Sequence, residues 1–168
     1  MITQIINQYD FNLAFAQRLV EDLTESQMTQ VASKGLVNHP AFTLGHLISG
    51  SALLVEDLGG TFIMEKEWAE LFLRKGPGDP RLPLTGVKYP NKKQLLSELE
   101  HQHDLVKLQL RNITNEELFK PLKWRFSNYM PTIADVVFFM CISHESMHLG
   151  QLSAWRRAME LPSALAKL

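Results

Sequence analysis

The sequence lacks long apolar runs and cysteine pairs. No stretch approaches the roughly 18 consecutive apolar residues that a membrane-spanning helix requires, and the N-terminus has no basic segment before an apolar run. We therefore expect neither a membrane span nor a signal peptide. The single cysteine, Cys141, excludes an intrachain disulfide and is compatible with a reducing compartment. Together these absences predict a cytoplasmic protein.

An excess of charge of one sign is also missing. Lysine and arginine total 17 and aspartate and glutamate total 18, which gives a formal net charge of -1. This balance provides no basic surface for nucleic acid or anionic lipid, so we expect neither as a partner. The 45% hydrophobic and 21% charged residues are typical of a globular chain. A length of 168 residues suits one domain, residues 1–168.

Four segments carry apolar residues in steps of three and four, the spacing of a helix with one buried face. They run from Ile6 to Leu23, from Pro40 to Leu58, from 91 to 112, and from about Thr132 to a point before Pro162. Asn38 or His39 would cap the second segment, and Thr132 with Asp135 resembles a capping box for the fourth. The buried seam predicted for the fourth segment is Ile133, Val137, Met140, His144, Met147, Gln151 and Trp155.

The connection between the second and third segments is long and rich in proline and glycine. Within residues 61–90 we predict one short helix between Met64 and Lys75, followed by irregular structure. Such a connection serves either as a lid over a site or as a plain surface crossover. The chain is thus predicted to be all-α, a four-helix bundle with a long connection between helices 2 and 3.

Three histidines could form one metal site. His144 and His148 are four residues apart, so both imidazoles lie on one face of a helix. The same spacing also occurs by chance on exposed helices, and a third ligand must come from elsewhere. His46 lies in the middle of the second helix beside Gly45, which removes bulk where another group could approach. Three neutral imidazoles leave a coordination position open, as in reactive sites, and suit Zn, Ni, Fe or Cu.

Other polar residues near these histidines have two interpretations each. His103 could be a fourth ligand, a hydrogen-bond donor to a ligand or a proton carrier, or simply a buried histidine bonded to an acceptor. Cys141 could be a soft ligand or a nucleophile, or an inert core residue. Glu145 completes the pattern HExxH with His144 and His148, in which a glutamate acts as general base of a protease. Such proteases need a downstream ligand and a substrate-binding sheet, which this sequence does not predict.

Two segments resemble the DinB-like metal-binding helical bundles, a family also described with the YfiT group. The first is Thr43-Leu44-Gly45-His46-Leu47. The second is His144-Glu145-Ser146-Met147-His148-Leu149-Gly150-Gln151-Leu152, followed by Arg156 and Arg157. The resemblance implies a four-helix bundle with a divalent metal, often Ni or Zn, on His46, His144 and His148. It also implies a homodimer, and it adds Gln151 to the pocket residues His103, Cys141 and Glu145.

Some members of the family that this sequence resembles are thiol transferases or isomerases that use low-molecular-weight thiols such as bacillithiol or mycothiol. The resemblance therefore favours a metal-dependent thiol S-transferase that acts on small electrophiles. Two alternatives remain open at this point. One is a non-catalytic metal-binding or dimerisation module of the stress response, and the other is a metal-dependent hydrolase with the same ligands.

Overall fold

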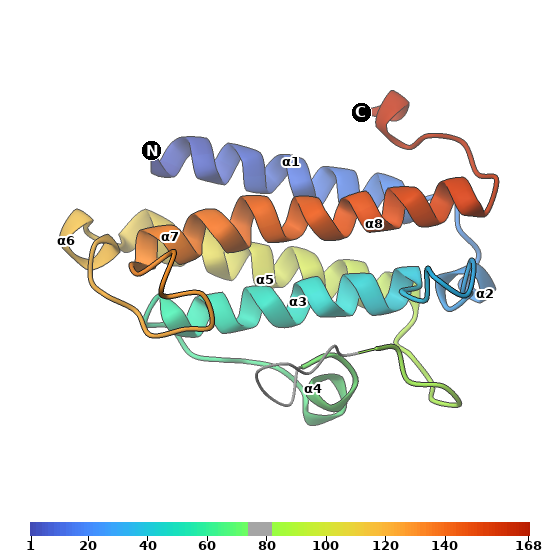
Figure 1. Ribbon diagram of the computed structural model, residues 1–168, viewed down its shortest axis with the longest axis horizontal. Coiled ribbons are helices and arrows are strands. Elements are labelled where there is room, and N and C mark those ends of the chain that lie inside the picture. The colour runs from blue at the N-terminus through green and yellow to red at the C-terminus, as the bar shows by residue number, and fades with distance from the viewer. Residues whose placement is uncertain (74–81) are drawn as a thin grey trace.

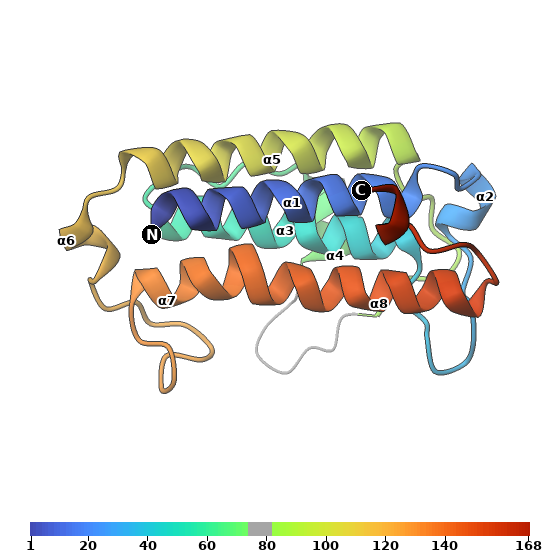
Figure 2. The same cartoon turned by 90° about the horizontal axis from the view of Figure 1, so that it is seen from above.

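Four long helical segments lie side by side along one axis in the computed structural model, which describes residues 1–73 and 82–168 (Figures 1 and 2). These segments are α1 (Ile2–Val20), α3 (Pro40–Asp57), α5 (Lys92–Asn112) and a continuous run of α7 (Ile133–Phe138), η1 (Phe139–His144) and α8 (Glu145–Ala158). Both α1 and α3 pack against α5 and α8. The described residues form no strand, so the all-α prediction is confirmed.

Short helices join the long segments, which makes the helices more numerous than the four expected. They are α2 (Glu25–Met28), α4 (Lys66–Phe72), α6 (Asn115–Leu118) and the 3-10 turn η2 (Leu165–Lys167). The short helix predicted in the long connection is α4, although it is shorter than expected. The lid or crossover role considered for this connection falls partly on residues 74–81, outside the described residues. No described helix has the length and apolar character to cross a bilayer.

Side-chain caps begin α3 and α7 where the sequence predicted. The Nδ1 atom of His39 accepts a hydrogen bond from the backbone N–H of Phe42 at 3.1 Å, directly before Pro40 begins α3. Burial lowers the pKa of His39 from 6.5 to about 4, against the opposing effect of a hydrogen bond to the backbone of Met28, so the ring stays neutral and keeps its cap. Thr132 and Asp135 form the predicted capping box of α7.

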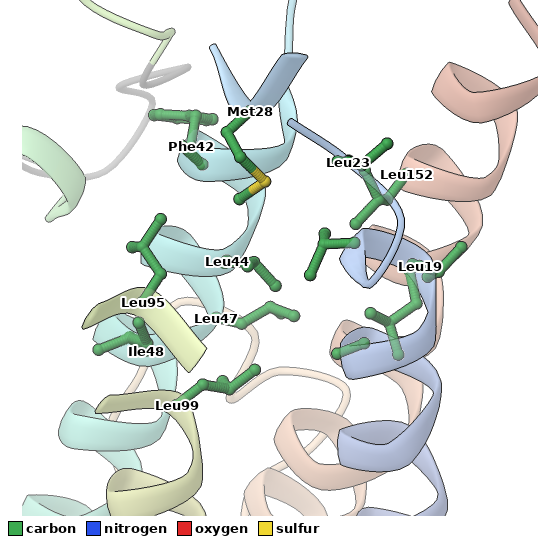
Figure 3. Packing of buried hydrophobic residues seen from close by; sticks show 14 of the residues in the cluster. Leu19, Leu23, Met28, Phe42, Leu44, Leu47, Ile48, Leu95, Leu99 and Leu152 are labelled. Atoms are coloured by element: carbon green, nitrogen blue, oxygen red, sulfur yellow. The ribbon is translucent and has the colours of Figure 1, made fainter. Parts of the chain in front are cut away.

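Leucine side chains from all four long segments fill the bundle interior. Figure 3 shows Leu19 of α1, Leu44 and Leu47 of α3, Leu99 of α5 and Leu152 of α8 converging, and each is at most 2% exposed. Burying one such side chain contributes about 1.5–3 kcal/mol to folding. This packing holds the four segments in a fixed relation, which any site built from several helices requires.

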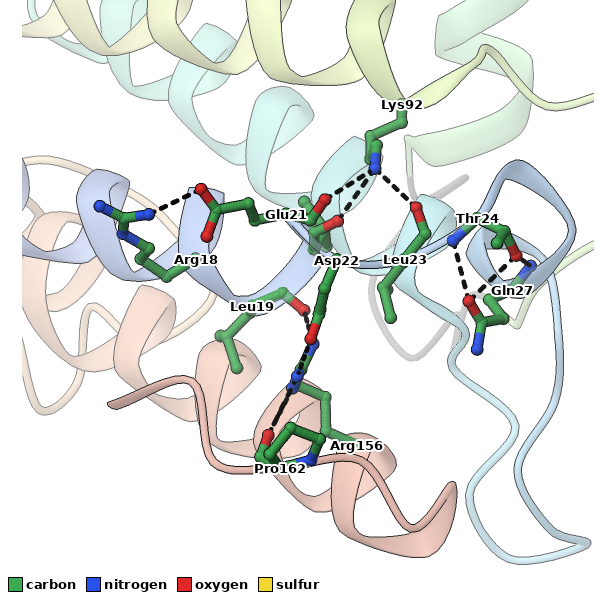
Figure 4. A network of polar contacts seen from close by, with 11 residues as sticks. Arg18, Leu19, Glu21, Asp22, Leu23, Thr24, Gln27, Lys92, Arg156 and Pro162 are labelled. Atoms are coloured by element: carbon green, nitrogen blue, oxygen red, sulfur yellow. Dashed lines mark hydrogen bonds and ion pairs between the residues drawn. The ribbon is translucent and has the colours of Figure 1, made fainter. Parts of the chain in front are cut away.

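A buried arginine ties the end of α8 to the end of α1 (Figure 4). The guanidinium of Arg156 donates to both carboxylate oxygens of Asp22, at 2.6 and 2.8 Å. It also donates to the backbone carbonyls of Leu19, at 2.8 Å, and Pro162, at 2.9 Å. Arg156 is only 2% exposed, whereas the next residue, Arg157, lies on the surface. Planar, bidentate pairing of this kind is specific to arginine.

The buried seam predicted for the fourth segment is wrong at Met147 and Gln151, although Trp155 is fully buried as predicted. Cys141 and Glu145 face the core there, while Met147 is 51% exposed and Gln151 lies on the surface. The cause is η1, a π-helix that breaks the 3.6-residue period. A π-helix adds about one residue to the turn, so every later side chain moves to the neighbouring face. A regular 3.6-residue period, which correctly predicted the buried faces of α1, α3 and α5, does not predict this rotation.

Candidate metal centre

Three histidines converge where α3 faces the continuous run of η1 and α8. His46 comes from α3, His144 ends η1, and His148 lies one turn later in α8. One ring nitrogen of each lies within 4.8 Å of the others, and the Nε2 atoms of His46 and His144 are 3.2 Å apart. All three residues are half-buried. The structure thus brings together the three residues that the sequence proposed as metal ligands.

The spacing of these nitrogens fits a divalent metal. Nitrogen ligands at about 2.0–2.1 Å from a tetrahedral zinc ion lie about 3.3 Å apart, close to the 3.2 Å between His46 and His144. The Nδ1 atom of His148 lies 3.1 Å from Oε1 of Gln151, which can accept a hydrogen bond from the ring N–H. This contact orients the ring and leaves Nε2 for a metal, the usual arrangement of a ligating histidine. Gln151 therefore contacts a proposed ligand, as the sequence suggested.

Two glycines of α3 make room for aromatic rings at the site. A Cβ atom on Gly50 would lie 3.2 Å from Cε1 of His144 and 3.1 Å from Cε of Met140. A Cβ atom on Gly45 would overlap the ring of Phe72, so α4 can pack on α3 only because this position is glycine. The group that fills the space beside Gly45 is thus an aromatic ring of the long connection.

The side chains of His103 and Glu145 contact each other in the core and are not part of the three-histidine cluster. Their Nε2 and Oε1 atoms are 2.8 Å apart, and the side chains are 1% and 4% exposed. The ring of His103 stacks on Tyr9 at a centroid distance of 3.7 Å. Burial raises the pKa of Glu145, while the nearby His103 acts in the opposite direction. His103 thus follows the simpler interpretation, a buried histidine bonded to an acceptor.

Cys141 is a core residue. It is fully buried, and burial together with nearby Glu145 raises the pKa of its thiol well above the usual value. A thiol in such surroundings stays protonated at neutral pH, which opposes the roles of soft ligand and nucleophile. Among the four pocket residues suggested by the sequence, Gln151 alone has a described hydrogen bond to one of the three histidines.

Sequence reasoning missed an aromatic cluster that reaches the site from the segment before α7. Trp124, Phe126 and Phe139 lie with ring centroids 5.3–5.5 Å apart. The ring of Phe139 lies 5.9 Å from that of His144, and all three aromatic residues are half-buried. Their only sequence signal was the density of aromatic residues near 124–126, which has no periodicity. The cluster forms an apolar wall next to the histidines.

Comparison with known proteins assigns the chain to a family. The profile of the DinB superfamily matches residues 8–152, and the chain belongs to this superfamily. A crystal structure of a conserved protein from Enterococcus faecalis has the same fold, with a TM-score of 0.71 over 94% of this chain and 96% of that one. The two are 16% identical, so the likeness concerns the fold alone. No curated protein matches the chain.

Proposed function

We propose that His46, His144 and His148 bind one divalent metal ion, nickel or zinc, and that the protein is a metal-dependent thiol S-transferase. The observation that carries the proposal is the convergence of three imidazole nitrogens within 4.8 Å from two packed helices. Neutral imidazole nitrogens are the commonest metal ligands in proteins, and three of them at this spacing can share one ion. Membership of the DinB superfamily supports the same interpretation.

A divalent metal held by His46, His144 and His148 would supply Lewis-acid chemistry that favours the thiolate form of a thiol. In the proposed reaction the thiol sulfur bonds to an electrophilic carbon, the leaving group departs with its electron pair, and the thiol proton is released. The protein orients the ligand rings through Gln151 and the packing at Gly50. Trp124, Phe126 and Phe139 offer an apolar surface to the electrophile beside His144.

Elemental analysis of the purified protein tests the metal site. We expect about one nickel or zinc ion per chain and its loss in His46→Ala, His144→Ala and His148→Ala. His101→Ala is the matched control, since His101 is an exposed histidine of α5 and should leave the metal content unchanged. Circular dichroism establishes that each variant is folded. Full metal content in a folded triad variant would remove that residue from the site.

Turnover with cellular low-molecular-weight thiols tests the activity. The metal-loaded protein is incubated with a panel of thiols and small alkylating electrophiles, and thioether product is measured. Absence of product with every pair at full metal occupancy would reduce the proposal to a non-catalytic metal-binding module. Hydrolysis of activated esters without thiol would instead favour the hydrolase alternative.

We further propose that the protein acts as a homodimer in the cytoplasm, as the resemblance to the DinB-like bundles implies. Light scattering should then give a mass of twice 19.2 kDa in solution. A mass of 19.2 kDa at micromolar concentrations would contradict the dimer without affecting the metal site.

A further inference from the structure

The π-helix η1 sets the direction in which His148 of α8 points relative to α7. It separates α7 from α8, and His144 is its last residue. The upstream helix is held by its capping box and by buried Val136 and Val137. One residue more or less in a helix rotates all later side chains by about 100° around the helix axis. If η1 were an ordinary α-helical turn, His148 would therefore face a different direction relative to α7.

An asparagine from α1 holds this π-helix. Backbone groups in a widened turn need partners outside the regular helical ladder. The Nδ2 atom of Asn12, a residue only 2% exposed, donates to the carbonyl of Cys141 at 3.0 Å. The carboxylate of Glu145 lies within reach of the same side chain. An amide nitrogen has two hydrogens, so Asn12 can bridge the middle of η1 and the first residue of α8.

The bridge continues to the helix that carries the third histidine. Glu145 is bonded to His103 at 2.8 Å, and His103 stacks on Tyr9. The hydroxyl of Tyr9 lies 2.8 Å from the hydroxyl of Ser51, which is on α3 with His46. All of these polar side chains are buried. Thus a continuous set of buried contacts connects the π-helix with α1, α5 and α3.

We propose that Asn12 is a positioning residue of the three-histidine site, which by holding η1 in its π-helical form directs His144 and His148 toward His46. This inference rests on the metal binding proposed above. Asn12 acts through the carbonyl of Cys141 and the carboxylate of Glu145, and it needs no contact with the metal. Its removal should therefore weaken metal binding by more than the loss of one buried hydrogen bond elsewhere in the core.

Cobalt(II) binding to the full chain tests this role, because the ligand-field bands of Co²⁺ report coordination geometry as well as affinity. Asn12→Leu removes both donor hydrogens at similar volume. It should raise the Co²⁺ dissociation constant by about 10–100-fold, the usual effect of losing a residue that orients a metal ligand, and change the band intensities. Gln102→Leu is the matched control, since it removes a buried amide that donates to a backbone carbonyl, that of Ile63 at 3.0 Å, outside this set of contacts. Its affinity and bands should equal those of the wild type.

The outcomes separate this inference from the metal-binding proposal. If the wild type binds Co²⁺ and a folded Asn12→Leu protein binds it equally tightly with the same bands, the positioning role is overturned and the metal site stands. An equal loss in Gln102→Leu would also overturn it, because the effect would then be general core damage. If the wild type binds no Co²⁺, Ni²⁺ or Zn²⁺, both proposals fall. Should Asn12→Leu not fold, Asn12→Ser retains one donor and should show a smaller loss of affinity; unchanged binding would overturn the role.

Discussion

Replacing Arg156 by leucine should lower the free energy of unfolding by about 3 kcal/mol. Its guanidinium is held by the Asp22 carboxylate at 2.6 and 2.8 Å and by the carbonyls of Leu19 and Pro162. Breaking a buried ion pair by removing one partner costs about 3–5 kcal/mol. The lower end applies because the Asp22 side chain is 33% exposed and becomes hydrated in the variant. At about 2–4 °C per kcal/mol, Tm should fall by about 6–12 °C.

Urea unfolding of the metal-free protein measures this loss, and the adjacent arginine provides the control. Arg157 lies on the surface of the same helix, so Arg157→Leu should change the free energy of unfolding by no more than about 0.5 kcal/mol. Equal losses in the two variants would refute the reasoning. A loss below about 1 kcal/mol in Arg156→Leu would do the same, since that is the value of an exposed pair.

Three further predictions concern the site and the cap of α3. Gly50→Ala places a Cβ atom 3.2 Å from the His144 ring and should weaken Zn²⁺ binding about tenfold in a chelator competition. Gly150→Ala, where a Cβ meets nothing within 4 Å, should leave the affinity unchanged; equal affinities in both variants would contradict the steric argument. Gln151→Leu should lower Zn²⁺ affinity about tenfold in the same titration by removing the acceptor of the His148 ring, and wild-type affinity would disprove this contact's role. His39 has its pKa lowered from 6.5 to about 4, so the unfolded chain binds a proton that the folded chain does not. Its contribution to stability is therefore present above pH 6.5 and is lost as pH falls toward 4, by up to about 1.4 kcal/mol per pH unit. His39→Asn keeps a capping side chain, and urea unfolding across this range should show a shallower pH dependence than the wild type; an identical slope would exclude His39 as the cause.

Local rules predicted most of the helices. Apolar side chains in steps of three and four placed α1, α3 and α5 to within a few residues, because one buried stripe is enough to define a helix in a bundle. The helix caps could also be predicted from the sequence, because Thr132 and His39 accept hydrogen bonds from backbone N–H groups only three residues away. The pairing of His144 with His148 also followed from helical geometry alone.

His46 required more than spacing. A histidine between apolar residues is compatible with many environments, and the resemblance to the DinB-like bundles singled it out. The fold then placed its Nε2 atom 3.2 Å from that of His144, across 98 positions of sequence. Because no local rule connects residues so far apart, this approach depends on the packing of α3 against η1 and α8.

The sequence by itself determined which segments are helical, where they begin, and which histidines share a helical face, because these depend on neighbours within one or two turns. Tertiary structure alone decided which way the face of α8 points. The π-helix is held by Asn12 from α1, a contact between positions 129 residues apart. It turned Glu145 into the core and Met147 out to the surface, against the helical period. The periodic pattern records the preference of each residue for burial, whereas the rotation of a helix is set by the side chains of the helices around it.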